Sequence, residues 1–267
     1  MSGQAGEPYP NEPGVDGQVL RLLSYNIQAG IETGQYRHYL TKGWRHVLPN
    51  RQRLHNLDQI AQLLRGYDLV ALQEVDSGSL RSGFLDMTEY LAHRAGYPHW
   101  FRQVNRDIGI VAQHSNGFLS MLAPQEVNRY RLPPGNGRGA MVLRFGEGEH
   151  ALYVCSLHLA LSRRMRRRQF DFLADLLFGA RNLVVMGDMN TSCDAQEFRH
   201  FIDHNDLKEP ACTKPTFPSW RPVKRIDHIL VSSSLRVRNA RVLDYPLSDH
   251  LPISIEVLVP GYQEAAA

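Results

Sequence analysis

Long apolar runs and paired cysteines are both missing from this 267-residue sequence. No stretch approaches the roughly 18 apolar residues of a membrane-spanning helix, and the first residues have neither the basic start nor the apolar core of a secretory signal. Only three cysteines occur, Cys155, Cys193 and Cys212, and no two of them form a CxxC pair. We therefore expect a cytoplasmic protein with reduced thiols, for which peripheral contact with a membrane stays open.

A strong net charge and the common nucleophile motifs are missing as well. The formal net charge is only +3, which is too small to indicate nucleic-acid binding by bulk electrostatics alone. There is no GxSxG, no Walker A sequence and no HExxH, which argues against the corresponding serine-hydrolase, P-loop and zinc-protease mechanisms. What is present, with 43% apolar and 21% charged residues, is the composition of an ordinary globular protein.

Short apolar runs alternate with helical patterns from Val19 onward, which predicts an α/β protein with two sheets and outer helices. We expect one domain over residues 18–260, between a flexible N-terminal tail at 1–17 and a C-terminal tail at 261–267. Strands are predicted at 19–26, 68–75, 150–161, 182–188, 225–232, 235–243 and 251–259. Helices are predicted at 51–64, 84–97 and 195–202, and another directly after residue 161.

The helical patterns also predict which side chains face the core. In the helix at 51–64 the expected buried face is Leu54, Leu57, Ile60, Ala61 and Leu64. In the helix after residue 161 it is Met165, Phe172, Leu173 and Leu176. For the helix "AQEFRHFI" we expect Asp194 to cap the N-terminus, because aspartate is a favoured capping residue.

The stretch "NLVVMGDMN" ends an apolar run in an acid and an amide. Residues i and i+2 of an extended chain point the same way, so Asp188 and Asn190 are expected on one face just past the end of a buried strand. Ligands of α/β sheets usually bind at such strand ends. The alternative is an ordinary turn, because Gly, Asp and Asn all form turns.

Further polar residues interrupt or follow apolar runs elsewhere in the chain. Strand alternation places Glu74 on the face of Val70 and Leu72, which would bury its carboxylate in part. The other residues of this kind are Asn26, His158, Asp227, Asp249 and His250. Each has a plain alternative: a satisfied core histidine for His158, a cap or an Arg225 pair for Asp227, and turn residues for the rest. Burying all of them without partners would cost several kcal/mol each, so we expect them to converge on one site.

The oxygen ligands in this set indicate a hard cation. Carboxylate and amide oxygens of Glu74, Asp249 and Asn26, with Asp188 as a further candidate, suit Mg²⁺ or Mn²⁺ better than zinc, which prefers more histidine and cysteine. The histidines would then be free for proton transfer and for stabilising charge on a phosphoryl group.

In order along the chain, the segments "SYNIQAG", "LQEVD", "HLAL", "GDMN", "IDHIL" and "SDHLPI" resemble the endonuclease/exonuclease/phosphatase superfamily, the deoxyribonuclease-like fold. They span residues 24–253, and the "HL" motif is similar to that of bacterial members. The resemblance implies a four-layer sandwich with two mixed β-sheets face to face, helices outside, and the active site at one end.

The resemblance also implies a role for each matching residue. Glu74 is similar to the principal metal ligand, with Asn26 and Asp249 nearby, and Asp188 to the residue that orients or deprotonates the attacking water. Asn190 resembles the group that holds a phosphate oxygen. Asp227 resembles the acid that orients His250, and His158 a second phosphate-binding histidine or general acid. The expected enzyme is therefore a Mg²⁺- or Mn²⁺-dependent phosphoester hydrolase.

The substrate stays open between three classes: a phospholipid head group, a small phosphodiester, and nucleic acid. Arg138 in "PGNGRGAM" is a candidate phosphate-binding residue because a glycine-rich loop lets backbone approach a ligand. The arginine run 163–168 could bind phosphate or an anionic surface, or be a solvated helix face. The aromatic and basic segment 36–45 could stack bases, rest on a lipid head-group layer, or be plain packing. We expect a phosphodiesterase first, a nuclease second, and a catalytically inactive phosphate-binding module last.

Overall fold

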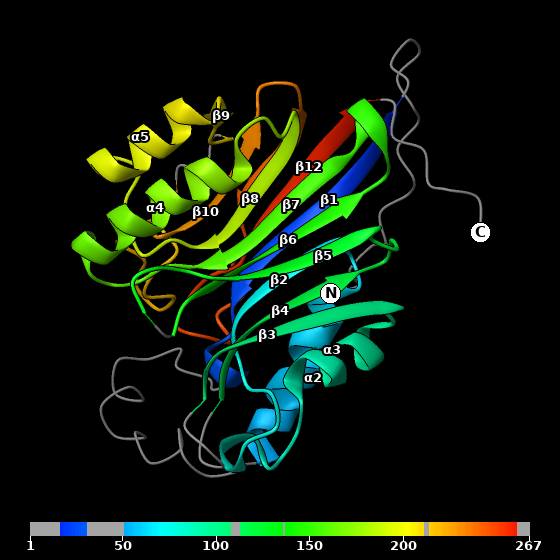
Figure 1. Cartoon of the computed structure of the whole chain (residues 1–267). Coiled ribbons are helices and arrows are strands. Elements are labelled where there is room, and N and C mark those ends of the chain that lie inside the picture. The colour runs from blue at the N-terminus through cyan, green and yellow to red at the C-terminus, as the bar shows by residue number, and fades with distance from the viewer. Residues whose placement is uncertain (1–16, 31–50, 108–112, 136, 211–213, 261–267) are drawn as a thin grey trace.

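The computed structural model describes residues 17–30, 51–107, 113–135, 137–210 and 214–260. These residues form two six-stranded sheets and four α-helices (Figure 1). The expected tails at 1–17 and 261–267, the segment 36–45 and Cys212 fall wholly or almost wholly outside this part of the chain. Within it, no helix is both long and apolar enough to cross a membrane.

The first sheet has the strand order β11-β12-β1-β2-β4-β3. Its strands are β1 (Gly17–Asn26), β2 (Leu69–Val75), β3 (His99–Asp107), β4 (Gln113–Ser120), β11 (Arg236–Val242) and β12 (Ile253–Pro260). Only β1 and β2 run parallel, and the other neighbours are antiparallel. The sheet is therefore mixed, as expected.

The second sheet repeats this plan with the order β5-β6-β7-β8-β10-β9. Its strands are β5 (Glu126–Arg131), β6 (Gly139–Phe145), β7 (Leu152–His158), β8 (Asn182–Asp188), β9 (Leu207–Lys208) and β10 (Asp227–Ser232). The central pair β7 and β8 is again the parallel one. Every residue of β8 and of β10 is buried, which is why both read as continuous apolar runs in the sequence.

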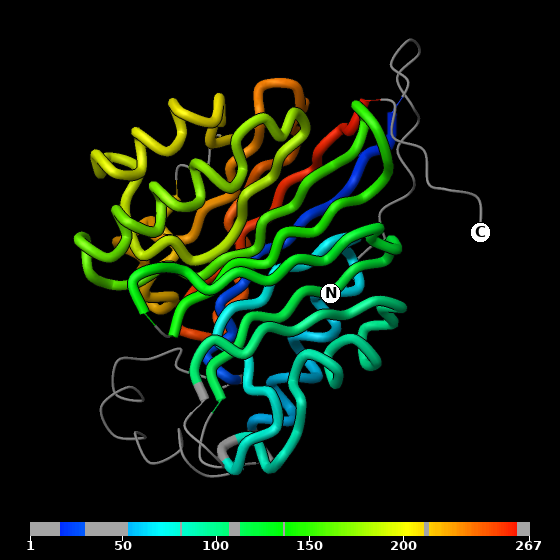
Figure 2. Tube along the Cα trace, in the orientation of Figure 1, coloured from blue at the N-terminus to red at the C-terminus, as the bar shows by residue number. Residues whose placement is uncertain are grey.

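Three hydrophobic layers hold the four-layer sandwich together. The inner layer lies between the sheets and includes Leu22, Phe118, Met186 and Ile255. The helices α2 (Arg51–Leu64) and α3 (Met87–Ala95) cover the outside of the first sheet, and α4 (Arg163–Leu177) and α5 (Gln196–His204) cover the outside of the second (Figures 1 and 2). The predicted fold class is confirmed.

Two helix faces differ from the prediction. In α2, Leu57, Ile60, Ala61 and Leu64 are buried, but Leu54 is 45% exposed. Leu54 lies at the edge of the sheet-facing side, and the helix buries the polar residues Arg53 and Asn56 in its place. The hydrophobic pattern alone could not reveal this, because it counts neither residue as part of the core.

The buried face of α4 is Arg166, Gln169, Phe170, Leu173, Ala174 and Leu177. Of the predicted face only Leu173 is buried, while Met165, Phe172 and Leu176 are half-buried. The helix is rotated because Arg166 and Gln169 bond the segment that follows β7. Arg166 donates to the carbonyl oxygens of Ala160 and Leu161, and Gln169 Oε1 accepts from the Ala160 amide at 2.9 Å.

The prediction that Asp194 caps α5 is wrong. Ala195 holds the N-cap position, where no side chain accepts a capping hydrogen bond. Asp194 instead accepts from Arg199 Nη2 at 3.0 Å on the surface of the helix. The ion pair with a residue of the first turn takes the carboxylate away from the backbone amides.

Candidate active site

The strand register places four chemically important positions in one row across the second sheet. Gly139 of β6 pairs with His158 at the end of β7, His158 pairs with Asp188 at the end of β8, and Asp188 pairs with Asp227 at the start of β10. The ends of the two central parallel strands therefore deliver His158 and Asp188 to one place, as expected for a parallel pair. Both side chains are buried.

Gly187 allows β8 to reach this position. Its φ is +151°, and a Cβ on it would lie 1.9 Å from the Leu157 carbonyl oxygen of the neighbouring strand. Asn190, three residues on, has φ 51°, a left-handed conformation that asparagine tolerates better than most residues. The motif "GDMN" therefore needs glycine and asparagine for its backbone as well as for its chemistry.

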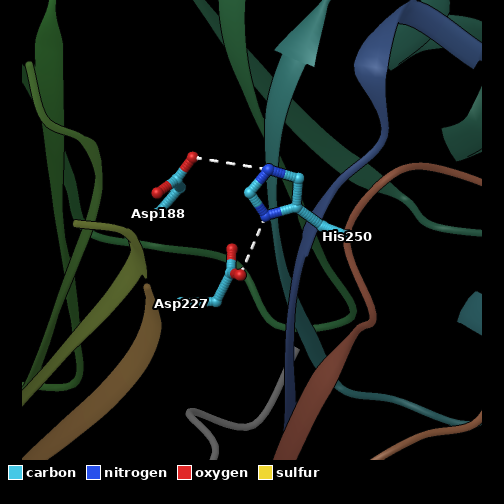
Figure 3. A group of neighbouring side chains, drawn as sticks. All are labelled: Asp188, Asp227 and His250. Atoms are coloured by element: carbon cyan, nitrogen blue, oxygen red, sulfur yellow. Dashed lines mark hydrogen bonds and ion pairs between the residues drawn. The ribbon is translucent and has the colours of Figure 1, made fainter. Parts of the chain in front are cut away.

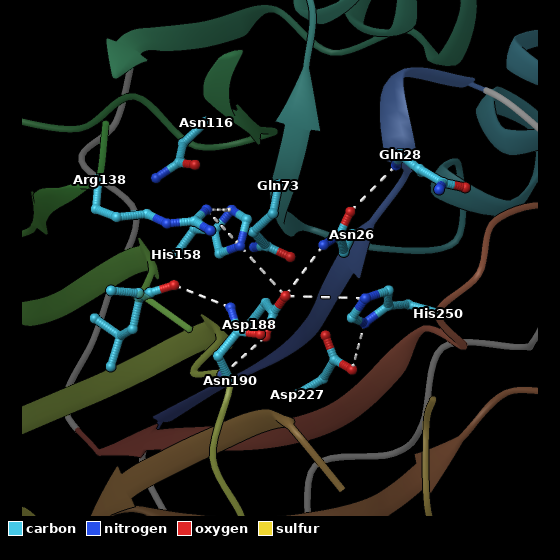
Figure 4. Close-up of polar contacts among 12 residues, drawn as sticks. Asn26, Gln28, Gln73, Asn116, Arg138, His158, Asp188, Asn190, Asp227 and His250 are labelled. Atoms are coloured by element: carbon cyan, nitrogen blue, oxygen red, sulfur yellow. Dashed lines mark hydrogen bonds and ion pairs between the residues drawn. The ribbon is translucent and has the colours of Figure 1, made fainter. Parts of the chain in front are cut away.

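The two oxygens of Asp188 have different partners (Figure 4). Oδ1 accepts from the Asn190 amide at 2.9 Å. This is the contact of an ordinary turn, so the alternative interpretation of this motif holds for one of the two oxygens. Oδ2 lies 3.1 Å from Asn26 Nδ2, 3.4 Å from His158 Nε2 and 3.9 Å from His250 Nε2. Asn26 belongs to the first sheet, so Asp188 joins the two sheets at this end of the sandwich.

His250 and Asp227 form a buried pair beside Asp188 (Figure 3). His250 Nδ1 lies 2.8 Å from Asp227 Oδ2, and Thr216 Oγ1 donates to the same oxygen at 2.5 Å. Burial lowers the pKa of His250, but the charges of Asp227, Asp188 and Asp249 outweigh burial and raise it to about 10. His250 is therefore an imidazolium whose Nε2–H points toward Asp188.

The charges of two histidines keep Asp188 ionised. Burial raises the pKa of Asp188, but the hydrogen bond and charge of His158 and the charge of His250 act against burial, and the pKa lies below its usual range. A carboxylate of this kind is a hydrogen-bond acceptor at every pH near neutrality.

Arg138 lies against His158 on the other side of the site. Its Nη1 is 2.8 Å from His158 Nδ1 and 2.7 Å from Nε2. Burial lowers the pKa of Arg138, although the charges of Asp188 and Glu74 act in the opposite direction. The position of Arg138 brings a fixed positive charge to the site.

Glu74 does not follow the expected strand alternation. A β-bulge lies between Leu72 and Val75, and Glu74 itself has φ 56°. Val75 packs in the same cluster as Val70 and Leu72, so it takes the helix-facing position that alternation assigns to residue 74. The bulge redirects Glu74 toward the charged groups of the site, where it acts on the pKa values of Arg138 and Asp249.

Glu74 and Asp249 are carboxylates without a basic partner. Within the described part of the chain, neither makes an ion pair with lysine, arginine or histidine. Burial and the charges of Glu74 and Asp188 raise the pKa of Asp249 to about 6, with His250 acting in the opposite direction. Glu74 is half-buried and Asp249 is buried, and a bound cation would relieve the repulsion between their charges. With the Asn26 side-chain oxygen nearby, this donor set fits Mg²⁺ or Mn²⁺.

A second group of possible ligands is less suitable for a metal. Ligand atoms of Asp188, Asp227 and His250 lie within 4.8 Å of one another, all buried. However, His250 Nδ1 is bonded to Asp227, and an imidazolium nitrogen has no lone pair to offer a cation. The geometry favours a charge-stabilised Asp–His–Asp arrangement here and a cation beside Glu74 and Asp249.

Several residues that position the site were missed by sequence reasoning. Ser248 donates to the Asn26 carbonyl oxygen at 2.6 Å and accepts from the His250 amide at 3.2 Å, so it fixes the loop of Asp249 and His250 to the end of β1. The motif "SDH" contained this serine, but nothing in the sequence assigned it a partner. Thr216 comes from a segment without any such signal.

Histidines, carboxylates and an arginine are thus gathered at one end of a two-sheet sandwich. The sequence model of the Endonuclease/Exonuclease/phosphatase family matches residues 23–250. The chain belongs to this family, as the motifs indicated. The activities in the family's name are all hydrolyses of phosphoesters.

Solved structures with the same fold have diverse names. The endonuclease/exonuclease/phosphatase from Beutenbergia cavernae has a TM-score of 0.71 at 20% identity, over 93% of this chain and 73% of that one. A mannosyl-6-phosphatase from Bacteroides thetaiotaomicron has 0.66 at 18%, over 89% and 99%. Sphingomyelinase C from Streptomyces griseocarneus has 0.61 at 17%, over 90% and 99%. No curated protein sequence matches the chain.

Proposed function

We propose that this protein is a metal-dependent phosphodiesterase in which water attacks phosphorus in line. The observation that carries the proposal is the placement of Asp188 between His158 and His250, close enough to Asp249 for their charges to interact. Glu74 and Asp249 make no ion pair with a described residue. This site offers an acceptor for water, positive charge for phosphoryl oxygens and acidic oxygens for a cation. Those are the parts that phosphoester hydrolysis needs.

Asp188 would orient the attacking water. Because its pKa is lowered, it accepts a hydrogen bond more readily than a full proton, so orientation is the larger part of its role. Asn190 Nδ2 donates to the Leu159 carbonyl oxygen at 2.9 Å, and its second N–H is available for a phosphate oxygen. The loop after β8 thus supports both nucleophile and substrate.

His250, His158 and Arg138 would stabilise the phosphoryl oxygens. His250 is charged because Asp227 holds its Nδ1–H, which leaves Nε2–H to donate to developing negative charge. Arg138 adds a permanent positive charge, and its guanidinium can either stay against His158 or bind a phosphate oxygen. Preorganised donors of this kind are worth roughly 3 kcal/mol each in a transition state.

Glu74, Asp249 and Asn26 would hold the metal. A bound Mg²⁺ or Mn²⁺ supplies Lewis-acid stabilisation of a phosphoryl oxygen. The protein's own contribution is the bulge at Glu74 and the Ser248 bond, which together hold the two carboxylates beside Asn26.

The test is a hydrolysis panel with Mg²⁺ or Mn²⁺. It includes bis-p-nitrophenyl phosphate, the monoester p-nitrophenyl phosphate, single-stranded RNA, plasmid DNA and phospholipid vesicles. We expect metal-dependent turnover of at least one diester, abolished by EDTA and by Asp188→Ala. The matched control is Asp194→Ala, which removes an exposed acid from the same loop. Turnover that survives in Asp188→Ala, or no turnover of any diester, would refute the proposal.

A further inference from the structure

Three arginines on one face of α4 have no ion-pair partner among the described residues. Arg164, Arg167 and Arg168 are exposed, and their spacing puts them on the same side of the helix. Their neighbours Arg163 and Arg166 are different, because both pair with the buried carboxylate of Glu197, at 3.2 and 3.3 Å. The run "RRMRRR" therefore contains two structural arginines and at least three with free guanidinium groups.

The free arginines line a groove between α4 and α5. The groove has a volume of about 1120 Å³, and its basic lining is Arg163, Arg164, Arg167, Arg168, Arg199 and His200. Three acids, Asp171, Glu197 and Asp203, also line it, so five arginines face three carboxylates. Glu197 is already neutralised by Arg163 and Arg166, which leaves the groove positive.

A second cavity connects this groove to the active site. It has a volume of about 790 Å³ and shares Arg163, Gln196 and Glu197 with the groove. Its lining also includes Asn190, the basic side chains of Lys224 and Arg225, and the exposed acid Asp194. The two adjoining cavities therefore extend from the residue that faces the scissile phosphate, on the proposed function, to the free arginines of α4.

We propose that the α4–α5 groove binds phosphate groups of a linear polyanion whose scissile phosphate lies at Asp188 and Asn190. The proposal rests on the proposed function, because it takes Asn190 as the residue that faces the scissile phosphate. The chemical class of the ligand is a chain of phosphodiesters, the linkage that the proposed function hydrolyses, as in a single-stranded nucleic acid. The arginine stretch 163–168 is about 8 Å long at 1.5 Å per residue, enough for two or more phosphates.

The shape and lining favour a chain over a membrane surface. A flat bilayer touches the rim of a groove, whereas a chain can lie in it and reach both helices. Among the described residues, the lining of the α4–α5 groove has no aliphatic side chain and, apart from the imidazole of His200, no aromatic ring, so it offers no apolar surface to acyl chains and little to stacked bases. The contacts it offers are charge contacts to phosphate. Leu161, which precedes the arginines and is 76% exposed, makes anionic vesicles the competing outcome of the test.

Binding is measured separately from turnover. Fluorescence anisotropy of a labelled 12-nucleotide single strand is recorded with Asp188→Ala protein, which prevents cleavage, at several salt concentrations. The groove variant is Arg164→Gln/Arg167→Gln/Arg168→Gln in that background. The control carries Arg236→Gln/Arg238→Gln/Arg241→Gln on β11, which removes the same charge from exposed positions of the other sheet. Inorganic polyphosphate serves as a competitor, and anionic phosphatidylglycerol vesicles are tested by sedimentation.

We expect the groove variant to weaken strand binding about tenfold and to reduce the slope of log Kd against log salt by about 2, since three phosphate contacts are lost. The β11 variant should stay within about twofold of the parent. Polyphosphate that displaces the strand would identify the phosphate chain itself as what is recognised, and failure to displace it would restrict the ligand to nucleic acid. Equal weakening by both triple variants, or no weakening by the groove variant, overturns the proposal.

Two further measurements separate this inference from the proposed function. Hydrolysis of bis-p-nitrophenyl phosphate, which is too small to reach the groove, should be unchanged by the groove substitutions in otherwise wild-type protein. If the wild type hydrolyses none of the diesters of the panel, the proposed function fails while the binding result still decides the groove. Vesicle binding that depends on the three arginines, without strand binding, would overturn the polyanion in favour of a lipid surface.

Discussion

The carboxylates of the two sheets differ in their surroundings. Asp188 and Asp227 of the second sheet lie beside histidines, and Asp188 has a lowered pKa. Glu74 of β2 and Asp249, in the loop before β12, make no ion pair with any described residue, and the pKa of Asp249 is raised to about 6. On the proposed function, the carboxylates therefore serve two purposes: Asp188 and Asp227 orient water and a histidine, and Glu74 and Asp249 bind a cation. The difference comes from partners, since Asp188 and Asp249 are both buried.

The largest test of this difference is Asp188→Ala. We expect kcat for a phosphodiester to fall by roughly 10³-fold or more, because water loses its orienting group and both histidines lose their shared acceptor. Steady-state kinetics and circular dichroism measure the loss and the retained fold. Asp194→Ala should keep full activity. An equal fall of kcat in that control would mean that Asp188 has no specific role in turnover.

Asp227→Asn should have the next largest effect. The amide keeps the shape of the side chain but cannot stabilise the His250 imidazolium, so we expect kcat to fall about 10²-fold with a smaller change in KM. The pKa of His250, followed by NMR of its ring protons, should fall with it. If His250 titrates as in the wild type, Asp227 does not hold its charge. Thr216→Val, which removes only the 2.5 Å hydrogen bond to Asp227, should have a smaller effect.

Glu74→Gln should act on the cation rather than on the chemistry. We expect the Mg²⁺ concentration for half-maximal turnover to rise by at least about tenfold, while activity at saturating Mg²⁺ falls much less. A full Mg²⁺ titration of turnover separates the two effects. An unchanged activation curve would mean that the acids of the first sheet do not hold the metal.

Asp249→Asn should stabilise the metal-free protein. A group whose folded pKa is raised contributes stability below its unfolded pKa near 4, and that stability is lost as pH rises through about 6. In EDTA at pH 7.5 we therefore expect the variant to gain about 1–3 kcal/mol in free energy of unfolding, and the gain to disappear near pH 4. Urea titrations at both pH values measure it. The lowered pKa of Asp188 has the opposite effect, because the ionised form of that group stabilises the fold. A lower free energy of unfolding for Asp249→Asn than for the wild type at pH 7.5 would contradict the difference between the two acids.

Much of the fold and of the candidate site could be predicted from the sequence, because buried strands appear as apolar runs and the site residues lie in recognisable motifs. The buried runs of β8 and β10 and the 51–64 helix were predicted with nearly correct bounds. Strand ends meet at one edge in a mixed sheet of this type, so placing Asn26, His158, Asp188 and Asp227 together needed only the order of strands. The family motifs then extended the prediction to the loop of Asp249 and His250.

The predictions that failed concern side chains whose positions depend on a bulge or on contacts with distant parts of the chain. Glu74 leaves the alternation because a bulge inserts one residue, and a bulge has no composition signal here. Arg166 is buried because it bonds two carbonyl oxygens and Glu197, which periodicity cannot detect. Likewise Asp194 prefers Arg199 to the helix end, and Arg138 reaches His158 only through the fold.

The most direct test of the central claim is hydrolysis of bis-p-nitrophenyl phosphate by metal-stripped protein during a Mg²⁺ titration, with wild type, Glu74→Gln and Asp188→Ala side by side. We expect no turnover without metal, saturable activation of the wild type, a shifted midpoint for Glu74→Gln, and turnover lower by roughly 10³-fold or more at every Mg²⁺ concentration for Asp188→Ala. Turnover that is independent of Mg²⁺, or activation curves that coincide for all three proteins, would contradict that claim.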